Sequence, residues 1–151
     1  MSLPAKLDVG GIPIPSRVKE SYNYLQSEPM MAVQVLTITS DLFLQSRIIE
    51  LAKSLGAIAK TVTSEEALIR EANSSRPNLV ILDLAASDYD PFSCAKRLKT
   101  MTPKPKILAV FPHIRTDLKL KAEKVMIDYV VPNSGFLKTL KSVLEREVRG
   151  R

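Results

Sequence analysis

The chain has 151 residues, 45% of them hydrophobic and 25% charged, and its 22 Lys and Arg against 16 Asp and Glu give a formal charge of +6. This composition is typical of one soluble globular domain with a sizeable core, and 5 glycines with 10 prolines exclude collagen-like and linker-like chains. No apolar run approaches the roughly 18 residues that cross a bilayer and no secretory signal pattern opens the chain, so we expect no membrane partner and a cytoplasmic location.

Metal-binding and nucleophilic side chains are scarce. Cys94 is the one cysteine and His113 the one histidine. A single thiol forms no internal disulfide and no cysteine-built zinc site, and a single imidazole excludes the usual histidine clusters and most catalytic triads. We therefore expect Cys94 to be a small core residue and the protein not to be an enzyme.

Residues 1–29 are predicted to be an extension that precedes the main domain, 30–151. Its prolines favour a turn or an extended segment, after which the spacing predicts a short helix over 17–26. The alternative is a partly disordered tail. The apolar residues of that helix are the expected contacts if a homodimer forms through the extension: Val18, Tyr22 and Leu25.

From residue 32 onward, short apolar runs alternate with helical patterns. Strands are predicted over 33–39, 57–62, 78–84, 106–111 and 127–131. Helices are predicted over 41–55, 64–73, 91–101, 116–125 and 136–148. Alternation with short loops predicts right-handed βαβ units and a parallel sheet covered on both faces. The size fits an α/β fold of the flavodoxin-like, doubly wound type, with five strands in the order 2-1-3-4-5 and five helices in three layers.

Local signals mark several helix ends. Gly56 is a natural residue to follow a helix, because it adopts a positive φ without strain. The run from Thr63 to Glu66 has the form of a capping box with Thr63 as N-cap. Asp90 is expected to cap the helix that starts at Pro91.

Two polar strand ends are expected to meet. The most apolar predicted strand runs into Asp83, and the first strand runs into Thr39, Ser40 and Asp41. In a doubly wound sheet, ligands bind at the carboxyl ends of the strands near the point where the strand order reverses. A site is therefore expected around Asp83, although capping of the next helix explains Asp41 equally well.

Four features of residues 32–148 carry a specific family pattern. They are the segments Thr63–Leu68, Arg76–Leu84 and Asp128–Val131, and an aspartate, Asp90, seven residues after Asp83. With these four features, residues 32–148 resemble the receiver domain of two-component response regulators. The resemblance implies that Asp83 corresponds to the phosphoacceptor, with Asp41 and Asp90 as candidates for its acidic pocket.

The chemistry of that family is incomplete here. The two acidic residues that hold Mg²⁺ in active receivers fall on Thr39 and Ser40, the Ser or Thr of strand 4 falls on Val110, and the Lys after strand 5 falls on Pro132. Phosphoryl transfer depends on positioning and charge neutralisation. With Asp41 and Asp83 as the only candidate metal ligands, the resemblance implies a degenerate receiver of the pseudo-receiver type, with no cofactor unless Mg²⁺ is retained.

Three functions are consistent with this pattern. The leading hypothesis is a non-enzymatic signalling and regulatory module that acts through protein–protein interaction. The second is an atypical receiver that accepts phosphate on Asp83 in a phosphorelay and needs Mg²⁺. The third is a basic module that binds nucleic acid, which the low aromatic content of 5% disfavours.

The positive charge is concentrated in the second half of the chain. Residues 1–75 hold seven basic and eight acidic residues, whereas residues 76–151 hold fifteen and eight. One-sided positive charge favours an anionic partner, and we expect that partner to be an acidic protein. The predicted partner surface comprises Arg115, Lys119, Lys121 and Lys124. Like charges on this surface oppose symmetric pairing, so we expect a monomer or a weak homodimer.

Overall fold

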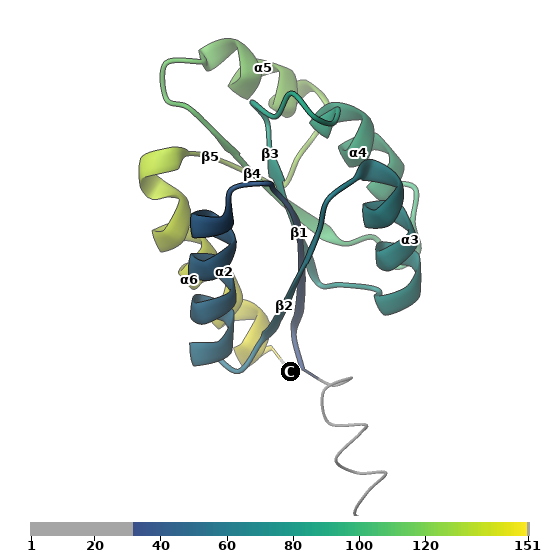
Figure 1. Cartoon of the computed structure of the whole chain (residues 1–151), viewed down its shortest axis with the longest axis vertical. Helices are drawn as coiled ribbons and strands as arrows, with labels where there is room; N and C mark the ends of the chain where they lie inside the picture. The colour runs from purple at the N-terminus through teal and green to yellow at the C-terminus, as the bar shows by residue number, and fades with distance from the viewer. Residues whose placement is uncertain (1–31, 151) are drawn as a thin grey trace, which may run out of the picture. The chain divides into compact units, whose positions relative to one another are not determined.

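The computed structural model describes residues 32–150 (Figure 1). The predicted extension and its helix over 17–26 lie outside the described residues, so the boundary between residues 29 and 30 stays a prediction. None of the helices in the described part is long and apolar enough to cross a membrane.

The described residues form one parallel sheet with helices on both faces. The strands are β1 (Gln34–Ile38), β2 (Ile58–Val62), β3 (Leu79–Asp83), β4 (Lys106–Phe111) and β5 (Tyr129–Pro132). The helices are α2 (Leu42–Ser54), α3 (Glu65–Ser75), α4 (Pro91–Leu98), α5 (Thr116–Lys124) and α6 (Phe136–Arg149), the last preceded by the 3-10 turn η1 (Asn133–Gly135). The strand order β2-β1-β3-β4-β5 confirms the predicted flavodoxin-like topology.

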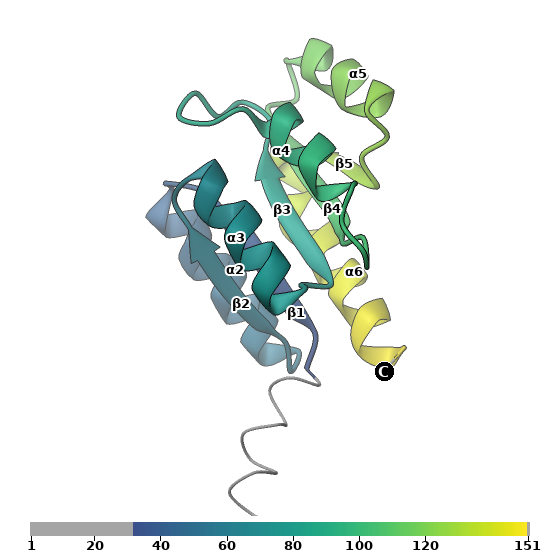
Figure 2. The ribbon, with the colours of Figure 1, turned by 90° about the vertical axis from the view of Figure 1, so that its right-hand side faces the viewer.

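The core lies in two layers, one on each face of the sheet. Helices α2 and α6 cover one face, and α3 and α4 cover the other (Figure 1). Figure 2 views the domain from the α3 and α4 side. Successive strand residues alternate between the two layers. Leu82 packs in the layer of α3 and α4, to which α5 also contributes, and Ile81 packs in the layer of α2 and α6. Cys94 is fully buried in the first of these layers, as expected for a small core residue.

Asn78 joins three strands at the amino edge of the sheet. Its side-chain oxygen accepts from the Gln34 amide at 2.8 Å, and its own amide donates to the Gln34 carbonyl at 2.9 Å. Its carbonyl accepts from the Lys106 amide at 3.1 Å. One residue therefore ties β1, β3 and β4 together where the strands begin.

The helix caps are partly as predicted. Asp90 caps α4 by accepting from the amides of Phe92 and Ser93 at 3.0 and 3.1 Å. Gly56 has a φ of +78°, as its place after α2 predicts.

The N-cap of α3 is Ser64, and the prediction of Thr63 was wrong. Ser64 has extended backbone angles, and its hydroxyl accepts from the Ala67 amide at 3.1 Å. The reciprocal half of a capping box is missing as well, because Glu66 turns its carboxylate to Arg97 on α4 at 2.9 Å.

Two further predicted boundaries needed correction. Helix α4 ends at Leu98 instead of residue 101, since the amides of Thr100 and Met101 donate to carbonyls three residues back, at 3.2 and 3.1 Å, instead of four. Strand β5 begins at Tyr129 instead of residue 127. The Ile127 amide still bonds to the Ala122 carbonyl at the end of α5.

Candidate functional site

Asp83 lies at the predicted place, the carboxyl edge of the sheet where the strand order reverses. Strand β3 carries it between β1 and β4. Two cavities, each of about 340 Å³, open beside it, and Thr39, Asp41, Asp83 and Ala85 line both. One cavity continues under the loop after β3 to Asp88. The other is completed by one residue from each of five further elements or loops: Leu44, Val110, Pro112, Asn133 and Phe136.

The Asp83 carboxylate is half-buried among groups that do not neutralise it. Its Oδ1 accepts from the Ala85 amide at 3.0 Å. Burial raises the pKa of Asp83, and the nearby carboxylates of Asp88 and Asp41 raise it further, against the opposing effect of the Ala85 hydrogen bond. No Lys or Arg lines either cavity. The site therefore disfavours additional negative charge.

Asp41 reaches the site but also serves as a helix cap. It lines both cavities with Asp83, so the structure brings these two predicted residues together. Its carboxylate accepts from the Leu44 amide at 3.1 Å and caps α2. Its own amide donates to the Thr39 hydroxyl at 3.1 Å. The capping role predicted for Asp41 is confirmed.

Asp90 does not belong to the acidic pocket, contrary to expectation. It lines neither cavity, because the loop before α4 directs its carboxylate to the first amides of that helix. Asp88, two residues before Asp90, lines the first cavity, where Asp90 was expected. His113 is exposed and lines neither cavity.

Tyr89 supports the site and was not anticipated from the sequence. The β1–β3 pairing runs from Val35 opposite Leu79 to Thr37 opposite Ile81. Beyond it, the Tyr89 hydroxyl accepts from the Asp83 amide at 2.9 Å and donates to the Ile38 carbonyl at 3.1 Å. Burial raises the pKa of this phenol, which keeps it protonated.

The two remaining family positions supply no polar group. Val110 is the β4 neighbour of Asp83 in the sheet and is 4% exposed. Pro132 pairs with Phe111 at the end of β5. An isopropyl group and a proline ring therefore stand where the sequence resemblance leads one to expect a hydroxyl and an ammonium group.

The residues around Asp83 do not fit the Mg²⁺ of active receivers. Mg²⁺ requires near-octahedral oxygen ligands and favours carboxylates. Thr39 and Ser40 offer neutral hydroxyls, and Asp41 already accepts from the start of α2. Within residues 32–150, no three His, Cys, Asp or Glu side chains converge as a metal site.

Two of the four cations predicted for the partner surface also make contacts within the domain. Arg115 makes two hydrogen bonds of 2.9 Å to Asp117. The Lys121 ammonium lies 4.4 Å from the centre of the Phe92 ring. Lys119 and Lys124 are exposed on α5 and form no ion pair with any described residue. Three large apolar side chains on or beside α5 are also exposed: Ile114, Leu120 and Met126.

Comparison with known proteins identifies the fold. No family model matches the chain, and no curated protein matches its sequence. Among solved structures, the signal receiver domain of a putative LuxO repressor protein from Vibrio parahaemolyticus is 17% identical, with a TM-score of 0.65 over 79% of this chain and 94% of that one. The receiver domain of a DNA-binding response regulator from Colwellia psychrerythraea 34H is also 17% identical, with a TM-score of 0.68 over 78% and 98%.

A longer protein gives the same result. NtrX from Brucella abortus, solved with ADP, is 16% identical, with a TM-score of 0.68 over 80% of this chain and 28% of that one. At these identities the comparisons report the fold, and they agree with the observed strand order. Residues 32–150 therefore have the fold of response regulator receiver domains, and the resemblance predicted from the sequence is confirmed at that level.

Proposed function

We propose that this chain is a non-enzymatic signalling and regulatory module, a degenerate receiver that acts by binding a protein partner in the cytoplasm. The observation that supports this most directly is the environment of Asp83. The carboxylate at the phosphoacceptor position is surrounded by two further carboxylates and by neutral groups, with no cation among the residues that line its cavities.

Phosphoryl transfer to this carboxylate is electrostatically disfavoured. The transition state spreads negative charge over the phosphoryl oxygens, and receivers offset it with a metal ion, a hydroxyl and an ammonium group. Here Asp41 and Asp88 add negative charge instead, and Val110 and Pro132 donate no hydrogen bond. In this proposal Asp83 keeps its position in the fold but does not accept a phosphoryl group.

Phosphorylation by a small-molecule donor tests the proposal. The full chain is incubated with acetyl phosphate and Mg²⁺, alongside a phosphorylatable receiver domain as positive control, and both are followed by intact-mass spectrometry. We expect an adduct on the control alone. A phosphate adduct that is lost in Asp83→Ala would overturn the proposal in favour of the phosphorelay alternative.

The partner surface that we propose is centred on α5. Exposed Lys119 and Lys124 lie on the same element as the exposed apolar side chain of Leu120, and Ile114 and Met126 flank it. A mixture of cations and large apolar groups suits an acidic protein, because large exposed apolar groups are typical of protein interfaces, whereas non-specific nucleic-acid affinity comes from basic groups that contact phosphates. The uncompensated lysines also oppose symmetric pairing, which is consistent with a monomer or a weak homodimer.

Charge reversal on α5 tests this surface. Lys119→Glu combined with Lys124→Glu is expected to abolish capture of an acidic partner from the host extract without lowering the thermal stability appreciably, since exposed charges contribute little to folding. Lys121 is left intact because it stacks on Phe92. The control, Lys53→Glu with Arg149→Glu, carries the same charge change on α2 and α6. Equal capture by both double variants would contradict the assignment of this surface. Salt-sensitive binding of DNA or RNA by the wild type would support the nucleic-acid alternative instead.

A further inference from the structure

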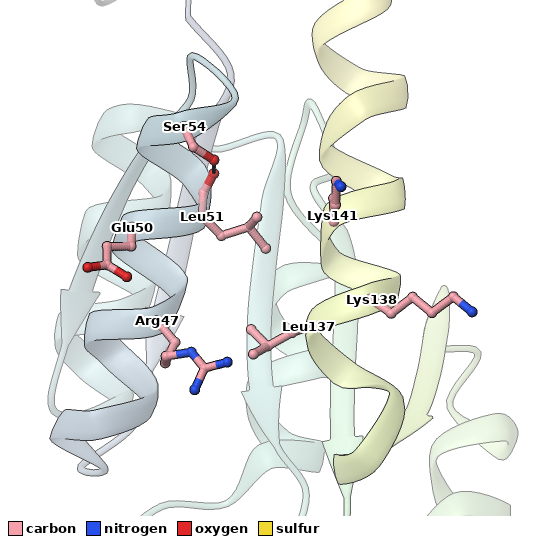
Figure 3. Close-up of a pocket in the computed structure, with 7 residues that line it drawn as sticks. All are labelled: Arg47, Glu50, Leu51, Ser54, Leu137, Lys138 and Lys141. Atoms are coloured by element: carbon pink, nitrogen blue, oxygen red, sulfur yellow. Dashed lines mark hydrogen bonds between the residues drawn. The ribbon is translucent and has the colours of Figure 1, made fainter.

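A groove separates α2 from α6 on the face of the sheet opposite to α4. Its volume is about 660 Å³, larger than either cavity beside Asp83 (Figure 3). The lining residues that matter for its chemistry are Arg47, Glu50 and Leu51 of α2, and Leu137, Lys138 and Lys141 of α6.

The floor of the groove is apolar and packs against the core. Leu51 and Leu137 point toward one another across it (Figure 3). Both are half-buried and pack against the core layer of α2 and α6. Phe43, one helical turn before Arg47, is 70% exposed, and the Arg47 guanidinium carbon lies 5.5 Å from its ring centre. Apolar surface therefore continues along α2 beyond the groove itself.

The rim of the groove is positively charged. Arg47, Lys138 and Lys141 line the groove, although Lys138 extends away from α2 (Figure 3). The lining holds one carboxylate, Glu50, which points away from α6 (Figure 3). None of the three cations forms an ion pair with a described residue. Elsewhere on the domain several cations do pair: Lys60 with Glu71, Arg97 with Glu65 and Glu66, Lys106 with Glu147, and Arg115 with Asp117.

We propose that this groove binds an acidic amphipathic helix of a partner protein. The lining positions of α2, from Arg47 to Ser54, span about 10 Å along the helix axis, enough for two turns of a third helix laid between the ridges. Apolar side chains of that helix cover Leu51 and Leu137, and flanking Asp or Glu side chains pair with Arg47 and Lys141. A second copy of this chain is disfavoured, because it would bring these cations against their own equivalents.

This site is separate from the partner surface on α5. Helix α5 packs in the other core layer, through Leu118 and Ala122. The groove therefore gives the module a second contact, and each contact can be removed without touching the other.

Two synthetic helical peptides test the proposal. Both carry Leu at spacings of three and four residues; the remaining positions are Glu-rich in the first and Lys-rich in its charge-reversed twin. Each is titrated into the isotopically labelled full chain and followed by amide chemical shifts. We expect the acidic peptide to shift resonances of α2 and α6 around the groove, and the basic twin to leave them unchanged. Equal effects of the two peptides, or shifts confined to other elements, would overturn the proposal.

Matched variants separate the groove from the rest of the surface. Arg47→Glu combined with Lys141→Glu is expected to weaken the acidic peptide about tenfold or more. Lys53→Glu with Arg149→Glu, on the same two helices but outside the groove, is expected to leave its affinity unchanged. Lys119→Glu with Lys124→Glu should also leave it unchanged, so failure of the α5 surface and failure of the groove are distinguishable. A homodimer of the wild type that Arg47→Glu with Lys141→Glu dissolves would assign the groove to a second copy and overturn the proposal.

Discussion

The phenol of Tyr89 holds the backbone of Asp83 in place. Its oxygen accepts from the Asp83 amide at 2.9 Å while its proton goes to the Ile38 carbonyl at 3.1 Å. The two strand ends at the site are thus joined through a side chain, beyond the last residues of β1 and β3 that pair directly. The position of Asp83 consequently depends on the loop that carries Tyr89.

Removing that hydroxyl is expected to destabilise the domain. Tyr89→Phe leaves the Asp83 amide and the Ile38 carbonyl without this partner, which costs about 1–3 kcal/mol in the free energy of unfolding. Chemical denaturation measures the change. Tyr129→Phe serves as the control, since the Tyr129 hydroxyl makes no hydrogen bond to the described residues; a similar loss in both variants would contradict the bridge.

The raised pKa of Asp83 predicts a pH-dependent gain in stability for Asp83→Asn. A carboxyl with a higher pKa in the folded chain holds its proton more tightly when folded, so its ionisation costs stability above the folded pKa. The cost disappears below the ordinary value of 3.8. We expect Asp83→Asn to melt above the wild type at neutral pH, with the difference vanishing near pH 3 or so.

Asp117→Asn provides a control of opposite sign for that measurement. The hydrogen bond from Arg115 lowers the pKa of Asp117, so its ionised form stabilises the folded chain above the ordinary pKa. The stability of this variant at neutral pH should fall slightly or stay equal. A destabilised Asp83→Asn at neutral pH would show that burial is not what governs the Asp83 carboxyl.

The corrected N-cap of α3 gives a prediction on two neighbouring residues. Ser64→Ala removes the hydroxyl that accepts from the Ala67 amide, and we expect a loss of about 1 kcal/mol. Thr63→Ala is the matched control and should change the free energy of unfolding by less than about 0.5 kcal/mol, as exposed substitutions usually do. The reverse ranking would restore Thr63 as the cap.

The centre of β3 should be sensitive to truncation. Leu82 is fully buried in the core layer of α3 and α4, so Leu82→Ala is expected to cost about 2–5 kcal/mol. Ile114, which is 76% exposed, offers the comparison: Ile114→Ala should stay within about 0.5 kcal/mol of the wild type. Urea denaturation of both variants is the measurement, and a cost below about 1 kcal/mol for Leu82→Ala would be incompatible with its burial.

The topology was predictable because long apolar runs and short polar loops leave few arrangements for a chain of this length. The N-cap of α3 was not predictable, because Thr63 and Ser64 are both good N-cap residues. The capping box also requires the Glu66 carboxylate, which instead pairs with Arg97 on another helix. Tyr89 gave no signal either. A tyrosine in a polar loop becomes a bridge only when the strand ends on either side of it are known.

The groove between α2 and α6 also lay beyond sequence reasoning. Leu51 and Leu137 are apolar residues within the predicted helices, and in the structure both are half-buried. How far two helices stand apart is decided by the sheet beneath them. The charges on the rim carry no pattern until that spacing places Arg47 and Lys141 around one cavity.

The hydrogen bonds of Asn78 at the amino edge of the sheet also affect the carboxyl ends of the strands. Parallel strands have no hairpin turn to fix how they align, so their register depends on the burial pattern along each strand and on the contacts that hold their ends. By engaging both Gln34 and Lys106, Asn78 sets the alignment of the three central strands at their starting edge. Five residues later the same alignment places Val110 beside Asp83. The group that lies beside Asp83 is therefore set in two places: by the residue type at position 110, and by an asparagine at the opposite edge of the sheet that fixes which residue of β4 stands there.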